Sequence, residues 1–211
     1  MHVHVITYEC GSKDAEIVLV QPVDNHDLAV IEDEIRKIAE LTQKDFRLIA
    51  VKVDCWNDDL SPWKAPAVYG KDGFGGSAKT MLDRIVPLCQ DADKKYYLGG
   101  YSLSGLFSLW AGFQMRFAGI AAASPSMWFP GFTDYMEKNQ PLTDNIYLSL
   151  GDKEEKTRNR VMATVGDCIR KGFWLLKEAG VHCTLEWNSG NHFYEPEIRM
   201  AKAFAWLINH E

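Results

Sequence analysis

The residues from Tyr96 to Phe107 read YYLGGYSLSGLF, an apolar run of strand length followed by a turn and an apolar helical run. Ser102 falls at the turn between the two. The residues two places before and after such a serine must be small, because the strand and the helix approach closely at a sharp turn. Gly100 and Ser104 meet that requirement. The stretch therefore predicts a strand–turn–helix elbow with Ser102 at its tip.

Strand-like and helix-like patterns alternate through the rest of the chain. The strand candidates are 3–8, 17–20, 46–53, 96–98, 120–123, 146–150 and 181–187. Apolar stripes of helical period lie within 28–41, 81–89, 161–176 and 198–208, and 103–113 is apolar enough all round to form a buried helix. This alternation predicts an α/β fold with a mostly parallel central sheet and helices on both faces. The first two strands, joined at 11–14, are expected to form an antiparallel edge pair.

Length, charge and cysteine content narrow the class of protein. A chain of 211 residues with 46% hydrophobic content is expected to form one domain over 1–211. Its net charge of -6 argues against nucleic acid and against an acidic membrane surface as partners. The five cysteines are widely spaced without a C-x-x-C pair, and no apolar run reaches membrane-spanning length. Because the N-terminus lacks a secretory pattern, we expect a cytoplasmic protein.

A serine at the tip of such an elbow is typical of a catalytic nucleophile. Backbone N–H groups and the dipole at the helix N-terminus favour the negative charge that develops beside it. The usual pattern is G-x-S-x-G, and here Ser104 replaces the last glycine. In one alternative Ser102 only caps the helix with its hydroxyl. In another Ser104 is the nucleophile, although the residue two places before it is not glycine. We favour Ser102.

A serine nucleophile needs a base, which in this type of elbow protein follows an acid in the chain order Ser, acid, His. His192 lies in the sequence SGNHF at 189–193, between the last strand and the last helix. In open α/β sheets, ligand sites form at the carboxyl ends of the strands. His182 begins the same strand at the opposite edge, so His192 is the predicted base.

The acid is expected after the strand 146–150, where three carboxylates follow Gly151. Asp152, Glu154 and Glu155 compete for the role. Glu154 is favoured, because the acid in this fold often follows the turn glycine by three residues. The other two acids remain open, and so does the interpretation of the whole cluster as a solvated turn.

Two backbone N–H groups should bind the oxygen of a tetrahedral intermediate. One belongs to Leu103, the residue after the nucleophile. The other is expected from the loop 21–26, where we predict Val23, because Pro22 has no N–H to donate. In the alternative, the polar residues of this loop only cap the helix that follows.

Aromatic residues are concentrated in loops that follow the predicted strands. Trp56, Trp63, Trp128 and Phe193 would line an apolar pocket suited to an aryl or acyl group. An equally good interpretation is that these rings pack the long loops onto the sheet. No H-E-x-x-H, P-loop or strand-following G-x-G-x-x-G motif occurs, so neither a metal nor an organic cofactor is expected.

Several segments resemble the esterase family that includes esterase D and the enterobactin-type siderophore esterases. They are the elbow at 100–107, Ser-Pro-Ser-Met-Trp at 124–128, the acid turn at 150–155 and Gly-Asn-His at 190–192. The resemblance covers the chain from about residue 17 onward and implies an α/β-hydrolase fold with the roles given above. The chain is short for this group, so we expect a minimal cap or none. The stretch 56–63 has no match that indicates a substrate.

The function that these observations predict is a serine hydrolase. Ser102, Glu154 and His192 would cleave a small-molecule carboxylic ester through an acyl-enzyme. Two alternatives stay open: a non-catalytic binding protein with the same fold, and a thioesterase or amidase that uses the same three residues. The sequence does not indicate an oligomeric state.

Overall fold

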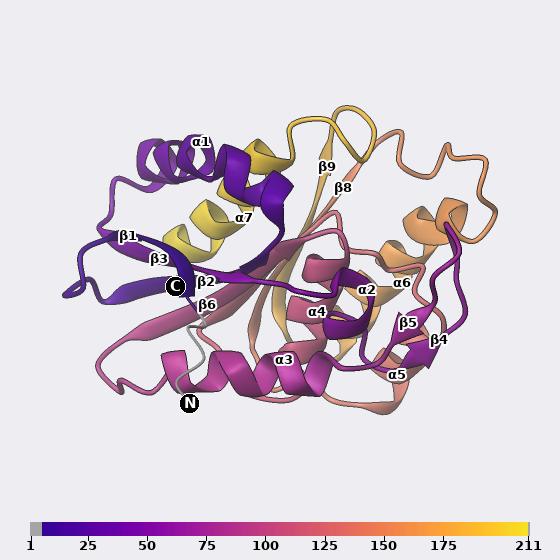
Figure 1. Cartoon of the computed structure of the whole chain (residues 1–211), viewed down its shortest axis with the longest axis horizontal. Helices are drawn as coiled ribbons and strands as arrows, with labels where there is room; N and C mark the ends of the chain where they lie inside the picture. The colour runs from indigo at the N-terminus through magenta and orange to yellow at the C-terminus, as the bar shows by residue number, and fades with distance from the viewer. Residues whose placement is uncertain (1–5, 211) are drawn as a thin grey trace.

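The computed structural model describes residues 6–210, and within them a central sheet of seven strands has the order β1-β3-β2-β6-β7-β8-β9. The strands are β1 (Ile6–Gly11), β2 (Ile17–Val23), β3 (Phe46–Lys52), β6 (Lys95–Tyr101), β7 (Gly119–Ala123), β8 (Asn145–Gly151) and β9 (His182–Asn188). Neighbouring strands are parallel except for β1, which runs antiparallel to β3 at one edge (Figure 1). β2 and β7 are buried throughout, as expected for strands that are covered on both faces.

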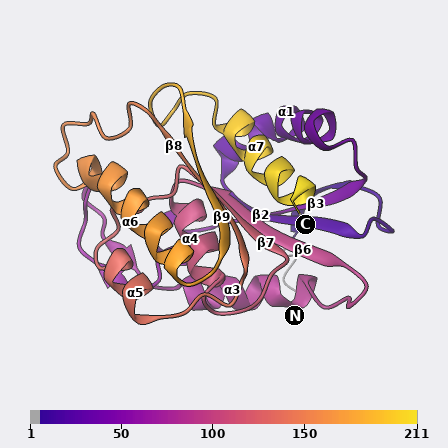
Figure 2. The ribbon, with the colours of Figure 1, turned by 180° about the vertical axis from the view of Figure 1, so that it is seen from behind.

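Helices cover both faces of the sheet, as Figure 1 and the reverse view in Figure 2 show. They are α1 (Asn25–Thr42), α2 (Trp56–Asp59), α3 (Ala78–Ile85), α4 (Leu103–Ala111), α5 (Phe132–Lys138), α6 (Val165–Glu178) and α7 (Pro196–Asn209). α1 and α7 pack together over one face, whereas α3, α4 and α6 bury the other, with α5 against α6. The predicted α/β architecture is confirmed. None of the helices in this part of the chain has both the length and the hydropathy needed to cross a membrane.

The predicted pairing of the first two strands is wrong. β1 pairs with β3, and β2 lies inside the sheet between β3 and β6. The reason is that β2 is apolar on both faces and is therefore buried best with a strand on each side. Gly11 ends β1 so close to the start of β3 that a Cβ there would lie 2.1 Å from the Phe46 carbonyl oxygen. Residues 3–5 of the predicted first strand lie outside the described residues.

Small elements were not predicted from the sequence. The segment between β3 and α3 contains α2 and a two-stranded pair, β4 (Lys64–Ala65) and β5 (Phe74–Gly75). α5 was also missed, because a helix of seven residues with two buried positions shows little periodicity. The helical patterns near 86 and 162 instead form single 3₁₀ turns, Val86–Leu88 and Met162–Thr164.

The order of the strands creates a divergence at the carboxyl edge of the sheet. The chain steps from β2 outward to β3 and later returns as β6 on the other side of β2. The loops that leave β2 and β6 therefore turn apart, and such a switch point is where open α/β sheets bind ligands. Ser102 directly follows β6, and Val23 ends β2.

A buried carboxyl group lies between α1 and β2. Glu34 and Gln21 are 2% and 1% exposed, and Gln21 Nε2 donates to Glu34 Oε2 at 3.4 Å. Burial raises the pKa of Glu34 to about 8, and the charges of Asp27 and Glu197 add to the effect. Within residues 6–210, neither Gln21 Oε1 nor Glu34 Oε1 has a hydrogen-bond partner. A proton on Glu34 supplies a donor to this pair, whose unsatisfied atoms are otherwise both acceptors.

Stability should therefore depend on pH through Glu34. The folded chain keeps this proton up to about pH 8, whereas the unfolded chain loses it near the ordinary glutamate pKa of 4.5. Folding stability then falls as pH rises through that window, by at most about 1.4 kcal/mol per pH unit. We expect the free energy of unfolding of Glu34→Gln, measured in urea, to rise relative to that of the parent protein from about pH 5.5 to about pH 8. Glu32→Gln on the exposed face of α1 is the control, and an equal difference at both pH values would refute the assignment.

Candidate active site

The backbone at Ser102 is held in a strained turn between β6 and α4. Ser102 has φ 59° and ψ -121°, and residues with a side chain seldom adopt a positive φ. A Cβ at Gly100 would lie 2.2 Å from Ser104 Oγ and 2.5 Å from Ser104 C. Position 100 must therefore be glycine, because the strand and the helix pass too closely there for any side chain.

The Ser102 side chain does not serve as a helix cap. Its hydroxyl makes no capping hydrogen bond to α4, and Ser102 Oγ lies 2.9 Å from His192 Nε2. Ser104 is fully buried, and its hydroxyl donates to the Pro22 carbonyl at 2.7 Å. The serine that replaces the last glycine of the usual pattern is thus accommodated because its hydroxyl has a buried acceptor.

His192 stands in the loop between β9 and α7, as predicted, and contacts a carboxylate on its other side. His192 Nδ1 lies 2.6 Å from Glu154 Oε2. An ionised carboxylate only accepts, so the proton of a neutral imidazole belongs on Nδ1, and Nε2 is left to accept from Ser102. Tyr101 Oη donates to the His192 backbone carbonyl at 2.7 Å and holds the loop in place.

The three candidate acids occupy different surroundings. Glu154 is 8% exposed and contacts His192. Asp152 Oδ1 instead accepts from the Gly190 N–H at 2.8 Å, which ties the loop after β8 to the loop after β9. Glu155 forms a half-exposed ion pair with Arg170 on α6. Of the three, the structure brings only Glu154 to the histidine.

Glu154 is held in its ionised form despite its burial. Its Oε1 accepts from the Gly151 N–H at 2.8 Å and from Ser124 Oγ at 2.7 Å. Burial by itself would raise the pKa of Glu154, but the hydrogen bond and charge of His192, with the Ser124 and Gly151 donors, lower it overall. The carboxylate is therefore ready to stabilise a positive charge on the imidazole.

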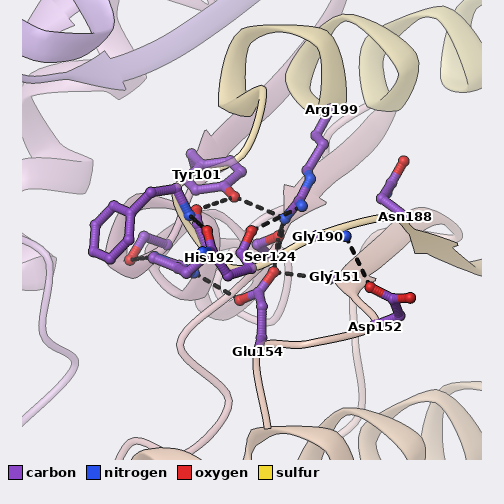
Figure 3. A network of polar contacts seen from close by, with 12 residues as sticks. Tyr101, Ser124, Gly151, Asp152, Glu154, Asn188, Gly190, His192 and Arg199 are labelled. Atoms are coloured by element: carbon purple, nitrogen blue, oxygen red, sulfur yellow. Dashed lines mark hydrogen bonds and ion pairs between the residues drawn. The ribbon is translucent and has the colours of Figure 1, made fainter. Parts of the chain in front are cut away.

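Arg199 completes this network and was missed from the sequence. It is 2% exposed and reaches from α7 to Glu154, with Arg199 Nη1 2.8 Å from Glu154 Oε1 (Figure 3). The same nitrogen donates to Tyr101 Oη and Ser124 Oγ, both at 3.1 Å. Nη2 donates to the carbonyls of Ser189 and Asn191. A lone arginine within the apolar face of the helix after His192 was the signal available in the sequence.

Removing Arg199 should destabilise the fold strongly. Arg199→Met leaves the Glu154 carboxylate buried without its cation, which typically costs about 3–5 kcal/mol. The free energy of unfolding in urea at neutral pH measures the loss. Arg170→Met is the matched control, because Arg170 pairs with Glu155 at the surface and its loss should cost about 1 kcal/mol or less. Equal losses in the two variants would contradict a dominant role for the buried pair.

Leu103, whose N–H is predicted to donate to the oxyanion, directly follows Ser102. Leu103 begins α4, and the N–H groups of a first helical turn have no partner inside the helix. Ser126 lies beside the elbow as well: its N–H donates to the Ser102 carbonyl at 3.0 Å, and its Oγ is 3.4 Å from Ser102 Oγ.

The geometry does not support Val23 as the second donor. The Val23 carbonyl accepts from Val53 N–H at 3.0 Å, on the β3 side of β2. The N–H and C=O of one strand residue point to the same side, so the Val23 N–H is directed toward β3 and away from Ser102. The next N–H, of Asp24, donates to Asp27 Oδ2 in the capping box of α1. The loop after β2 therefore acts as a helix cap, which was the alternative interpretation of its polar residues.

A cavity of about 600 Å³ opens in front of Ser102 and His192. Trp128 and Phe193 line it, as predicted, and Tyr69 was missed. Trp56 and Trp63 do not line it. Trp63 Nε1 donates to the Pro130 carbonyl at 2.9 Å, and its ring packs on aromatic side chains of the core. Trp56 is half-buried against the same core, so both rings follow the packing interpretation. Among residues 6–210, no cluster of His, Cys, Asp or Glu is arranged to hold a metal ion.

The chain has the α/β-hydrolase fold: a mostly parallel sheet carries a strained serine elbow after β6, with an acid and a histidine after later strands. No protein-family model matches the sequence, and no curated protein matches it. Solved structures with a similar fold do exist, and several of them are esterases or serine hydrolases.

The siderophore hydrolase EstA from Aspergillus nidulans is 20% identical, with a TM-score of 0.67 over 93% of this chain and 83% of that one. An IroE-like serine hydrolase from Shewanella oneidensis is 14% identical, with a TM-score of 0.68 over 95% and 74%. The enterobactin esterase FES from Shigella flexneri is 10% identical, with a TM-score of 0.62 over 95% and 54%. The neighbours include the esterase group that the motifs resemble, and at these identities the likeness establishes the fold.

Proposed function

We propose that this chain is a serine hydrolase that cleaves a small-molecule carboxylic ester through an acyl-enzyme. The observation that carries the proposal is the continuous line of hydrogen bonds from Ser102 Oγ through His192 to Glu154, at 2.9 and 2.6 Å. These distances lie within the reach that a nucleophile, a base and an orienting acid require. Esterase names among structures of the same fold support the same reaction class.

Each residue would act through one specific atom. Ser102 Oγ attacks the ester carbonyl carbon while His192 Nε2 takes its proton, and Glu154 stabilises the imidazolium that results. The Leu103 N–H donates to the oxyanion of the tetrahedral intermediate. Collapse expels the alcohol, which receives the proton from Nε2. A water then attacks the acyl-enzyme by the same steps, releasing the acid and restoring Ser102.

Backbone strain favours an enzyme over a binding protein with the same fold. The positive φ of Ser102 costs about 1–3 kcal/mol, which persists only where the surroundings enforce it. That conformation places the hydroxyl at His192 Nε2 instead of at the helix N-terminus, where it would serve stability. The same three residues can cleave esters, thioesters and amides. These activities are therefore distinguished by comparing an ester, a thioester and an amide that carry the same acyl group.

A fluorophosphonate probe should label the protein at Ser102. An activated serine attacks the phosphorus, and the adduct is located by peptide mass spectrometry. We expect stoichiometric labelling that is abolished in Ser102→Ala. The unlabelled parent protein should hydrolyse p-nitrophenyl esters, whereas the labelled protein and Ser102→Ala should not. The midpoint of urea unfolding, compared with that of the parent protein, checks that Ser102→Ala is folded. A folded protein that takes up no label would refute the proposal, and label on Ser104 would refute the assigned nucleophile.

Two neighbouring acids, Glu154 and Glu155, provide an internal test of the role of the triad acid. Glu154→Gln should lower kcat/KM for a p-nitrophenyl ester by about 10²–10⁴-fold, because the imidazolium loses its partner and its orientation. Glu155→Gln removes a carboxylate one residue away whose partner is Arg170, and it should change kcat/KM by less than about threefold. Comparable losses in both variants would show that Glu154 has no special part in the reaction.

A further inference from the structure

Positive charges are gathered on one wall of the cavity. The loop between β8 and the 3₁₀ turn at Met162 carries Lys153 and Lys156, and both side chains line the cavity. Arg158 and Arg160 follow in the same loop, and both are exposed. This local excess of cations contrasts with the net charge of -6 of the whole chain.

The acids of this loop are all engaged, whereas its cations are not. Asp152 accepts from the Gly190 N–H, Glu154 contacts His192 and Arg199, and Glu155 pairs with Arg170. Within residues 6–210, no hydrogen bond or ion pair involves the side chain of Lys153 or Lys156. Glu154 is the one carboxylate of the described chain that lines the cavity, and Arg199 already balances its charge. The charge presented to a bound molecule is therefore positive.

Apolar residues, half of them aromatic, make up another part of the cavity wall. Its apolar members are Tyr69, Pro125, Trp128, Met162, Val165 and Phe193. Phe193 stands at the rim next to the His192 ring and is 86% exposed, an unusual position for a phenylalanine. A molecule that fits this cavity would place an apolar or aromatic body against these rings and a charged group toward the lysines.

We propose that the cavity selects esters that carry a negatively charged group, such as a carboxylate, recognised by Lys153 and Lys156. This inference rests on the proposed hydrolase function and names the substrate class for that site. Two ammonium groups at a cavity mouth raise the local concentration of an anion and hold it once bound. Exposed pairs are individually weak, so the two lysines together should give a preference of about tenfold over a neutral ester of the same shape.

The test compares matched esters that differ in one charge. Mono-4-nitrophenyl glutarate and its methyl ester vary the acyl side, and 4-acetoxybenzoate and its methyl ester vary the leaving group. The kcat/KM ratio of the anionic to the neutral member is measured at low ionic strength and neutral pH. We expect a ratio of about ten in at least one pair, falling toward one at about 0.5 M salt, where charges are screened within about 4–5 Å.

Matched variants assign the preference to the cavity. The double variant Lys153→Ala/Lys156→Ala should bring the ratio close to one. Lys171→Ala/Lys177→Ala removes the same charge from α6, away from the cavity, and should keep the ratio. Ser102-dependent hydrolysis with a ratio near one in both pairs, or a ratio that survives loss of Lys153 and Lys156, would overturn the inference and leave the hydrolase intact. Failure to hydrolyse any of the four esters in a Ser102-dependent way would overturn the hydrolase proposal itself.

Discussion

The buried ion pair between Glu154 and Arg199 is the interaction on which the site depends. Glu154 joins the turn after β8 to Ser124 after β7 and to His192 after β9, and Arg199 ties all of these to α7. A buried ion pair is tolerated only where the remaining hydrogen-bonding groups of both partners are satisfied. Here the loops after β7, β8 and β9 satisfy them, and the same loops hold residues of the candidate active site. The same ion pair therefore holds α7 against the sheet and orients the imidazole of His192.

The sequence could predict those features that depend on neighbouring residues and on chain order. The glycine–serine turn between an apolar strand and an apolar helix placed Ser102, and the fixed order of strands placed His192 and Glu154 at the same edge. The roles of these residues in catalysis stay predictions, although their geometry suits them. Arg199 was missed because the side chains that it contacts, Tyr101, Ser124 and Glu154, are distant in sequence and become its neighbours only when α7 docks.

Other errors have a similar origin in long-range pairing. The direction of the Val23 N–H depends on which strand lies on each side of β2, and that order does not follow from the local pattern. The long loop between β3 and α3 directs Trp63 into the core and Tyr69 toward the cavity. Alternation of apolar residues says nothing about which ring of such a loop faces inward, because the loop has no fixed period.

The serine at position 104 has a mechanical consequence for the elbow. The β2–β6 ladder ends at Val20 and Leu98, and the Pro22 carbonyl lies two residues beyond its end on β2. Ser104 donates to this carbonyl. Glycine at position 104, as in the common pattern, would remove this hydrogen bond, which is typically worth about 1 kcal/mol. The acceptor belongs to the main chain and is present whatever residue stands at position 22, so Ser104 cross-links the end of β2 to the start of α4 in a way that a glycine could not.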